Sequence, residues 1–143
     1  MKQKGFTLIE LLIVIAVIAI LIGIALPRFK GMRDEGNYAK SLGELKSLQT
    51  AVESYFIHNG SYPATGTSWQ SSITGATPKL IGTALNDPFA ASGTQYVISK
   101  SPNGNFYVVY SVGFGGSGSA TIDNSGTITA TSSPIFVSNA SES

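Results

Sequence analysis

Near its N-terminus the chain carries a long apolar segment that contains a single charged residue. From Phe6 to Leu26 there are 21 residues, and among them only Glu10 is charged. At about 1.5 Å of rise per residue, a helix of this length spans roughly 30 Å, which is the thickness of the hydrocarbon core of a bilayer. The segment is therefore predicted to be a membrane-spanning helix.

The position of Glu10 inside an apolar helix needs an explanation. A carboxylate inside the hydrocarbon region is costly unless it has a partner or a role. One interpretation places Glu10 at the level of the lipid headgroups, one turn into a helix whose N-terminal dipole favours a negative charge. The other gives it a cationic partner on a neighbouring chain, so that its desolvation cost favours assembly. Its position alone does not separate the two.

The residues around Glu10 carry a resemblance. Residues 4–10 read Lys-Gly-Phe-Thr-Leu-Ile-Glu and follow the short basic segment that begins at Met1. This junction resembles the processing site of the type IV pilin superfamily. The resemblance implies a leader of residues 1–5, cleavage by a membrane peptidase after Gly5, and N-methylation of Phe6. It also implies a filament subunit in which Glu10 neutralises the Phe6 amine of a neighbouring subunit.

A secretory signal peptide is the competing explanation for a basic and then apolar N-terminus. Gly23-Ile24-Ala25 offers a small-x-small cleavage site, but the apolar region is longer than the usual 7 to 15 residues and contains a charge. Basic residues lie on both sides of the apolar region, so their distribution does not fix the orientation. The pilin resemblance places the N-terminus in the cytoplasm and the rest beyond a single pass of the inner membrane, before a periplasmic or extracellular filament forms.

Pro27 follows the apolar segment and is predicted to kink or end the helix. Beyond it, apolar residues recur at spacings of three and four: Phe29, Met32, Leu42, Leu45, Leu48, Val52, and Tyr55 or Phe56. One kinked helix from about residue 6 to 57 is therefore predicted, with its first half in the membrane or the filament core. The glycines near Pro27 indicate either local weakness, as in related pilins that partly melt at the stretch matching Gly23 to Pro27, or close helix packing.

The remainder is predicted to form a small antiparallel sheet. Asn59-Gly60 and Pro63 are helix-stop signals. Strands are predicted at residues 95–99, 106–112, 120–122, 127–131 and 135–137, with hairpin turns at 102–105 and 123–126. The fold class is thus α+β, with a long kinked N-terminal helix packed on the sheet. The predicted parts are the leader (1–5), the transmembrane or filament-core segment (6–26) and a globular pilin-like domain (27–143).

Composition excludes several classes of function. The chain has no cysteine, so it lacks the C-terminal disulfide loop of many type IV pilins, and another interaction must hold its C-terminal region. Its net charge is +1, which does not predict nucleic-acid binding. His58 is the single histidine, and no carboxylate pair or serine motif stands at a catalytic spacing. The chain is therefore predicted not to be an enzyme and to need no cofactor.

Two motifs resemble the major pseudopilin of type II secretion: Asn59-Gly60-Ser61-Tyr62-Pro63 and Asp87-Pro88-Phe89. That family usually holds a calcium ion in its C-terminal loop, and here Gly115 replaces one of the calcium carboxylates. Asp123 is the only acid between Phe89 and Ala140, whereas calcium takes about six to eight oxygens. Asp123 is thus a weak candidate calcium ligand, and the interpretation we favour is that it forms the Asp-Asn-Ser-Gly turn.

The resemblance implies a homopolymeric pseudopilus subunit, membrane-inserted before assembly. Its partners would be the prepilin peptidase, an inner-membrane assembly platform and minor pilins. The alternative is the major pilin of a surface pilus used for adhesion, motility or DNA uptake. A third reading is a secreted binding module released by signal peptidase.

Overall fold

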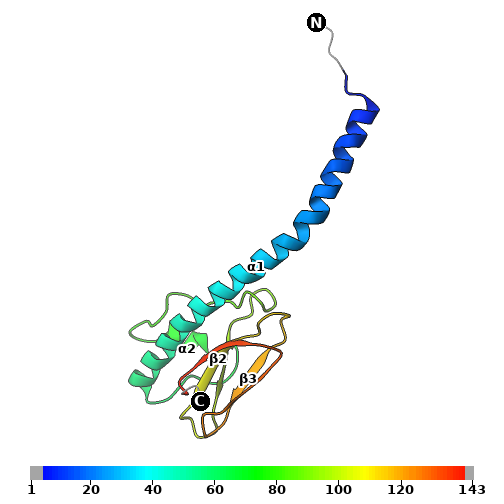
Figure 1. Cartoon of the computed structure of the whole chain (residues 1–143). Helices are drawn as coiled ribbons and strands as arrows, with labels where there is room; N and C mark the ends of the chain where they lie inside the picture. The colour runs from blue at the N-terminus through cyan, green and yellow to red at the C-terminus, as the bar shows by residue number, and fades with distance from the viewer. Residues whose placement is uncertain (1–4, 141–143) are drawn as a thin grey trace. The chain divides into compact units, whose positions relative to one another are not determined.

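The computed structural model describes residues 5–140 (Figure 1). Its elements are helices α1 (Leu8–Asn59) and α2 (Gln70–Thr74) and strands β1 (Val97–Lys100), β2 (Tyr107–Ser111), β3 (Ser119–Ile122), β4 (Ile128–Thr131) and β5 (Ile135–Ser138). The chain divides into two compact units, one up to Gly36 and one from Asn37 onward. The predicted α+β class, with a long N-terminal helix and a small antiparallel sheet structure, is confirmed.

Helix α1 continues through Pro27. Of the two outcomes predicted there, an end of the helix does not occur, and the kink stays a prediction. The helix ends where the sequence indicated, because Gly60 has a φ of 69° and its N–H donates to the carbonyl of Phe56 at 2.7 Å. A glycine in this left-handed conformation is a common helix C-terminal cap.

The apolar stripe of α1 faces the core over only part of its predicted length. Leu45, Leu48 and Val52 are fully buried, and Leu42 packs against the same core. Earlier stripe members are exposed, however, with 65% of Phe29 and 68% of Met32 accessible. The predicted stripe thus lies on one helix, and tertiary contact, which spacing alone does not reveal, decides which part of it is covered.

The strands form two sheets rather than one. The first has the order β1-β2-β5 and the second pairs β3 with β4, all antiparallel. Both predicted hairpins are confirmed. The pairing of β5 with β2 was not predicted, because it skips the β3–β4 hairpin along the chain.

Strand β2 lies at the centre of the domain and is buried on both faces. Tyr107 and Val109 point into the core shared with α1, whereas Val108 packs against Ala120 and Ile122 of the β3–β4 hairpin. Alternate residues of a strand point to opposite faces of its sheet, so the three-stranded sheet is the middle layer. Helix α1 covers one face and the hairpin covers the other.

Hydrogen bonds hold the C-terminal region that no disulfide can hold. Strand β5 pairs with β2 through Ile135 to Ser138. Just beyond it, Asn139 accepts a bond from the Tyr107 N–H at 2.9 Å and donates to the Asn105 carbonyl at 2.9 Å. From α1, the Gln49 amide donates to the Ser138 carbonyl at 2.8 Å. The last strand is thereby tied to the sheet and to the helix.

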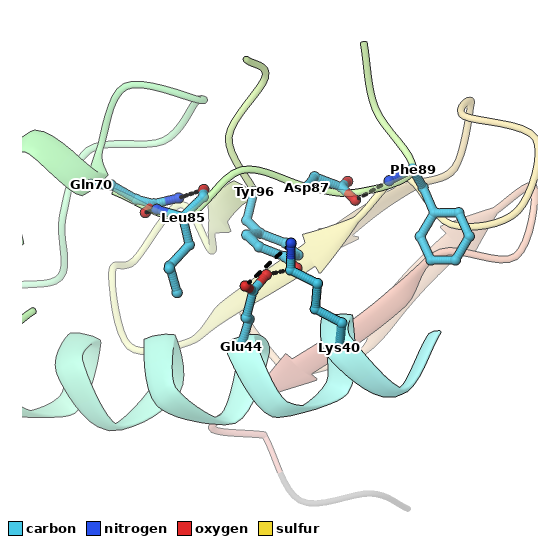
Figure 2. A network of polar contacts seen from close by, with 7 residues as sticks. All are labelled: Lys40, Glu44, Gln70, Leu85, Asp87, Phe89 and Tyr96. Atoms are coloured by element: carbon cyan, nitrogen blue, oxygen red, sulfur yellow. Dashed lines mark hydrogen bonds and ion pairs between the residues drawn. The ribbon is translucent and has the colours of Figure 1, made fainter. Parts of the chain in front are cut away.

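Two buried tyrosines donate hydrogen bonds to acids of α1. The Tyr96 hydroxyl lies 2.6 Å from Glu44 Oε2, and the Tyr107 hydroxyl lies 2.8 Å from Glu53 Oε1. Figure 2 shows the first pair, with Lys40 Nζ 3.8 Å from the other Glu44 oxygen. Burial first, and then the bond to the carboxylate, raises the pKa of each tyrosine well above its usual value. Glu44 and Glu53 thus border the buried stripe of α1.

The connection between α1 and β1 is fixed by buried polar groups. Gln70, at the start of α2, is fully buried and forms a reciprocal pair with the backbone of Leu85, with bonds of 2.7 and 2.9 Å (Figure 2). The indole N–H of Trp69 donates to the Tyr96 carbonyl at 2.8 Å. The short helix α2 lies within this segment.

The raised tyrosine pKa values predict alkaline sensitivity of the domain. For a tyrosine whose pKa rises on folding, the stabilisation is complete below the unfolded pKa of about 10 and is lost as the pH rises toward the folded pKa. The Tm of a fragment beginning at Lys30 should therefore fall between about pH 10 and pH 12. In Tyr107→Phe the Tm should be lower at neutral pH but should fall less over that window. Tyr38→Phe, at an exposed ring, is the control. If the Tm fell equally with pH in the unsubstituted fragment, in Tyr107→Phe and in Tyr38→Phe, the raised pKa of Tyr107 would be contradicted.

Candidate functional site

The N-terminal junction is the first part of the candidate site. Residues Gly5 to Thr7 precede the helix, which begins at Leu8, and the side chain of Phe6 is 88% exposed. The predicted scissile bond after Gly5 thus lies in non-helical chain. Residues 1–4 of the predicted leader lie outside the described residues.

Thr7 and Glu10 form a reciprocal cap at the start of α1. The Thr7 N–H and hydroxyl donate to Glu10 Oε2 at 2.8 and 2.7 Å, and the Glu10 N–H donates to the Thr7 hydroxyl at 3.3 Å. This is the capping-box arrangement, in which two otherwise unpaired N–H groups of the first helical turn find acceptors. The signal for it, Thr-x-x-Glu before an apolar run, was in the sequence and was missed.

The cap gives Glu10 a structural role without excluding an intermolecular one. A carboxylate has two oxygens and about four acceptor positions, and both bonds from Thr7 go to one oxygen. An incoming ammonium group can therefore bind the same carboxylate while the cap persists. The cap is compatible with either sequence interpretation of Glu10, and both stay predictions.

The helix that follows presents its apolar side chains outward. Every large hydrophobic residue from Leu8 to Leu26 is at least about half exposed, with Ile18 the lowest at 48%. Among the described residues, α1 is the one helix long and apolar enough to cross a membrane, with a mean hydropathy of 3.1 over its most apolar window. This segment (the blue part of α1 in Figure 1) must be covered by lipid or by protein.

The loop between β2 and β3 is where the resemblance expected calcium. Gly115 has no side-chain ligand to offer, and its φ of 88° is a conformation that side-chain-bearing residues rarely adopt. The backbone oxygens of Val112 and Gly113 already accept bonds from Gly118 and Gly116. Added Cβ atoms at Gly113 and Gly118 would stand only 2.4 Å from backbone oxygens, so close packing shapes this loop.

The Asp123 carboxylate accepts hydrogen bonds from within its own turn. Its Oδ1 accepts bonds from the Ser125 N–H, the Ser125 hydroxyl and the Thr127 N–H at 2.6 to 2.9 Å. These donors, led by the Ser125 hydroxyl, lower the pKa of its carboxyl. The described residues contain no group of three or more metal-binding side chains. With one engaged carboxylate and no acid in the neighbouring loop, the residues present do not fit a calcium site.

Asp87 is a carboxylate whose role sequence reasoning missed. It is 4% exposed, and it accepts bonds from the Phe89 N–H (2.9 Å, Figure 2), the Ser111 hydroxyl (2.7 Å) and the Val112 N–H (2.8 Å). The Ser111 oxygen in turn accepts from the Gly113 N–H at 3.1 Å. Asp87 therefore joins its own turn to the end of β2 and to the start of the glycine loop. The Asp-Pro-Phe motif marked the turn, but it gave no indication that Asp87 would bond to Ser111 and Val112.

His58 has a local structural role. It lies in the last turn of α1, and its Nδ1 is 2.8 Å from the Ser54 carbonyl. A cationic side chain there also interacts favourably with the helix dipole. Pro27, the remaining predicted site residue, lies inside α1.

Known proteins with similar sequences include type II secretion proteins and fimbrial proteins. The family described as "Prokaryotic N-terminal methylation motif" matches residues 1–26. Type II secretion system core protein G of Escherichia coli K12 is 30% identical over 112 residues, which cover 78% of this chain and 74% of that protein. Fimbrial protein EcpB of Eikenella corrodens is 52% identical over 59 residues, 41% of this chain and 37% of that protein. No solved structure matches.

The methylation motif, the apolar helix and the small α+β domain define a pilin-like protein of the type IV pilin superfamily. More narrowly, because the match to core protein G covers most of both chains, the chain belongs to the family of type II secretion system core protein G. This confirms the predicted resemblance. The EcpB alignment is little longer than α1, which has 52 residues. The alignment with core protein G covers 112 residues and therefore extends far into the domain.

Proposed function

We propose that this chain is the structural subunit of a type II secretion pseudopilus. The observation that carries the proposal is the alignment with core protein G over 78% of the chain. The exposed apolar half of α1 supports it, because that half needs a partner and none of the described residues covers it. In the membrane the partner is lipid, and in the filament it is α1 of other copies.

We propose that the subunit is first inserted in the inner membrane, which it crosses once with its N-terminus in the cytoplasm. Prepilin peptidase cleaves after Gly5 and Phe6 becomes N-methylated, which the match to the methylation motif supports. An inner-membrane assembly platform and minor pilins then build the periplasmic homopolymer. The relatives are structural pilin-like proteins, which fits a role without catalysis or nucleic-acid binding.

Processing can be tested directly. Mass spectrometry of the protein from a host with the assembly machinery should find a mature chain that begins at N-methyl-Phe6. The non-helical Gly5–Thr7 segment supports this expectation, because a peptidase acts on extended chain. A mature chain that begins close after Gly23-Ile24-Ala25 would instead establish the secreted binding module.

Glu10→Gln separates the two roles of Glu10. Glutamine keeps the capping box, since its amide oxygen accepts the Thr7 bonds, but it removes the charge that would neutralise a neighbouring amine. We expect normal insertion and cleavage but a filament yield lower by about tenfold or more, because every subunit lacks the ion pair and a weakening of about 1.4 kcal/mol per added subunit reduces its affinity about tenfold. The yield is measured by shearing and pelleting filaments.

Thr7→Val is the matched control for Glu10→Gln. It removes the hydroxyl of the cap and keeps the Glu10 charge, so it should reduce filament yield much less. Wild-type yield from Glu10→Gln, or an equal reduction in both variants, would remove the Glu10 charge from the assembly mechanism.

A surface pilus is the alternative function, and the 52% identity to a fimbrial protein over 59 residues is the observation that favours it. The two functions differ in the phenotype of a deletion. Loss of the gene should abolish secretion of exoproteins across the outer membrane while leaving surface pili intact. Loss of surface pili with normal secretion would reverse the assignment.

We also propose that the domain folds without calcium, with Asp87 joining its own turn to the end of β2 and the start of the glycine loop. Millimolar calcium should then change the Tm of a fragment beginning at Lys30 by less than about 1 °C, because stabilisation requires binding to the native state. Asp87→Ala should lower stability by about 2 to 4 kcal/mol, since it leaves buried N–H groups unpaired.

Asp123→Ala is the comparison variant for this experiment, and it should have little effect with or without calcium. A calcium-dependent rise of several degrees that Asp123→Ala abolishes would overturn the proposal. It would also show that backbone oxygens complete a calcium site around Asp123.

A further inference from the structure

Arg28 and Glu35 are opposite charges on one face of α1 that have no partner within reach on their own helix. They are seven residues apart, which is two helical turns, and both are exposed. Helical ion pairs form at separations of three or four residues. The residues at those separations from either charge are all uncharged: Ile24, Ala25, Gly31, Met32, Tyr38 and Ala39. The ion pair found among the described residues is a different one, Lys40 with Glu44.

An apolar groove lies on the same face of the helix. It has a volume of about 390 Å³ and is lined by Leu21, Ile24, Ala25, Arg28, Phe29 and Met32. Ala25 has the smallest side chain of the lining, and Arg28 is the charged residue among them. The groove and the two charges all lie in or beside the part of α1 that has no core of its own.

We propose that this groove receives α1 of a second copy of the chain, displaced by seven residues along the helix axis. The proposal rests on the proposed function, since it describes how subunits of the filament meet. In this register Glu35 of the second copy lies beside Arg28, and Met32 of the second copy lies over Ala25. Seven residues correspond to a displacement of about 10 Å.

The charges select this register over an unshifted one. Two parallel helices without displacement would place Arg28 against Arg28 and Glu35 against Glu35, and like charges in contact cost energy. A displacement of seven residues converts both repulsions into attraction. It also places a large flexible side chain, Met32, opposite a small one, which fills the groove.

The contact is open-ended. Each copy uses Arg28 toward one neighbour and Glu35 toward another, so the interface is heterologous and extends into a filament. An antiparallel pair would also match the charges and would close as a dimer. Copies inserted into one membrane share their orientation, however, so the parallel arrangement is the one available to them.

The pairing of Glu10 with the Phe6 amine calls for a displacement in the same direction. In that contact, too, the copy that supplies the carboxylate lies toward the N-terminal end of its neighbour. Its displacement is four residues, about 6 Å in helical chain. Residues 5–7 are not helical, and extended chain rises about 3.3 Å per residue, which carries the amine further in that direction.

Charge reversal in the full-length protein, in cells that assemble the filament, tests the proposal. Arg28→Glu alone and Glu35→Arg alone should each lower filament yield about tenfold or more, because each places like charges together. The double reversal should restore at least about half of the wild-type yield. Subunit abundance and N-terminal processing should stay at wild-type levels in all three.

Lys30→Glu is the matched control. It makes the same charge change near the same end of the apolar segment, but on a different face of α1, and it should leave the yield nearly unchanged. Failure of the double reversal to restore filaments, or an equal reduction in Lys30→Glu, would overturn the register. If Glu10→Gln abolishes filaments while both single reversals do not, this register is wrong and the proposed function stands.

Cysteine crosslinking distinguishes the open-ended contact from a closed pair. The chain has no cysteine, so Arg28→Cys/Glu35→Cys introduces the only two thiols. Oxidation of assembled filaments should give a ladder of covalent multimers, whereas either single variant should stay monomeric. Dimers that do not extend further would indicate the antiparallel pair, and the absence of crosslinks in assembled filaments would contradict the contact itself.

Discussion

The structure depends on one division within α1. From Leu42 onward the helix buries an apolar stripe against the sheet, while the large apolar side chains of its first 19 residues, Leu8 to Leu26, are exposed. Burial of apolar surface contributes about 25 cal/mol per Å², so an exposed helix of this kind drives association with lipid or with other copies. We therefore expect the domain to fold by itself and the apolar half to remain free for assembly.

Folding of the domain without cysteines follows from where its polar groups are buried. Asp87, Gln70 and Asn139 each connect segments far apart in the chain through two or more hydrogen bonds to backbone groups. Bonds that satisfy buried backbone groups are costly to remove, because the group left behind has lost its water as well. The C-terminal strand is thus held by hydrogen bonds where other small domains use a disulfide or a metal.

The sequence predicted the features that arise locally. The apolar run, the Gly60 cap and the two hairpins each depend on a few consecutive residues, and all of them are found. The capping box of Thr7 and Glu10 was equally local and was overlooked, because the charge of Glu10 has competing explanations in an apolar segment. The pairing of β5 with β2 and the partners of Asp87 could not be predicted, since they join segments separated by 24 or more residues. Phe29 and Met32 show the same limit: helical spacing identifies a stripe, but only tertiary contact shows which part is covered.

The two proposed charge contacts differ in what they contribute to the filament. Glu10 lies in the apolar segment, where a carboxylate without a partner is costly, so pairing it strongly favours the assembled state. Arg28 and Glu35 lie just beyond that segment and are solvated in the free subunit. An exposed ion pair of this kind contributes little affinity, but like charges forced together oppose a wrong register. We therefore assign affinity to the apolar helix and Glu10, and the choice of displacement between neighbours to Arg28 and Glu35.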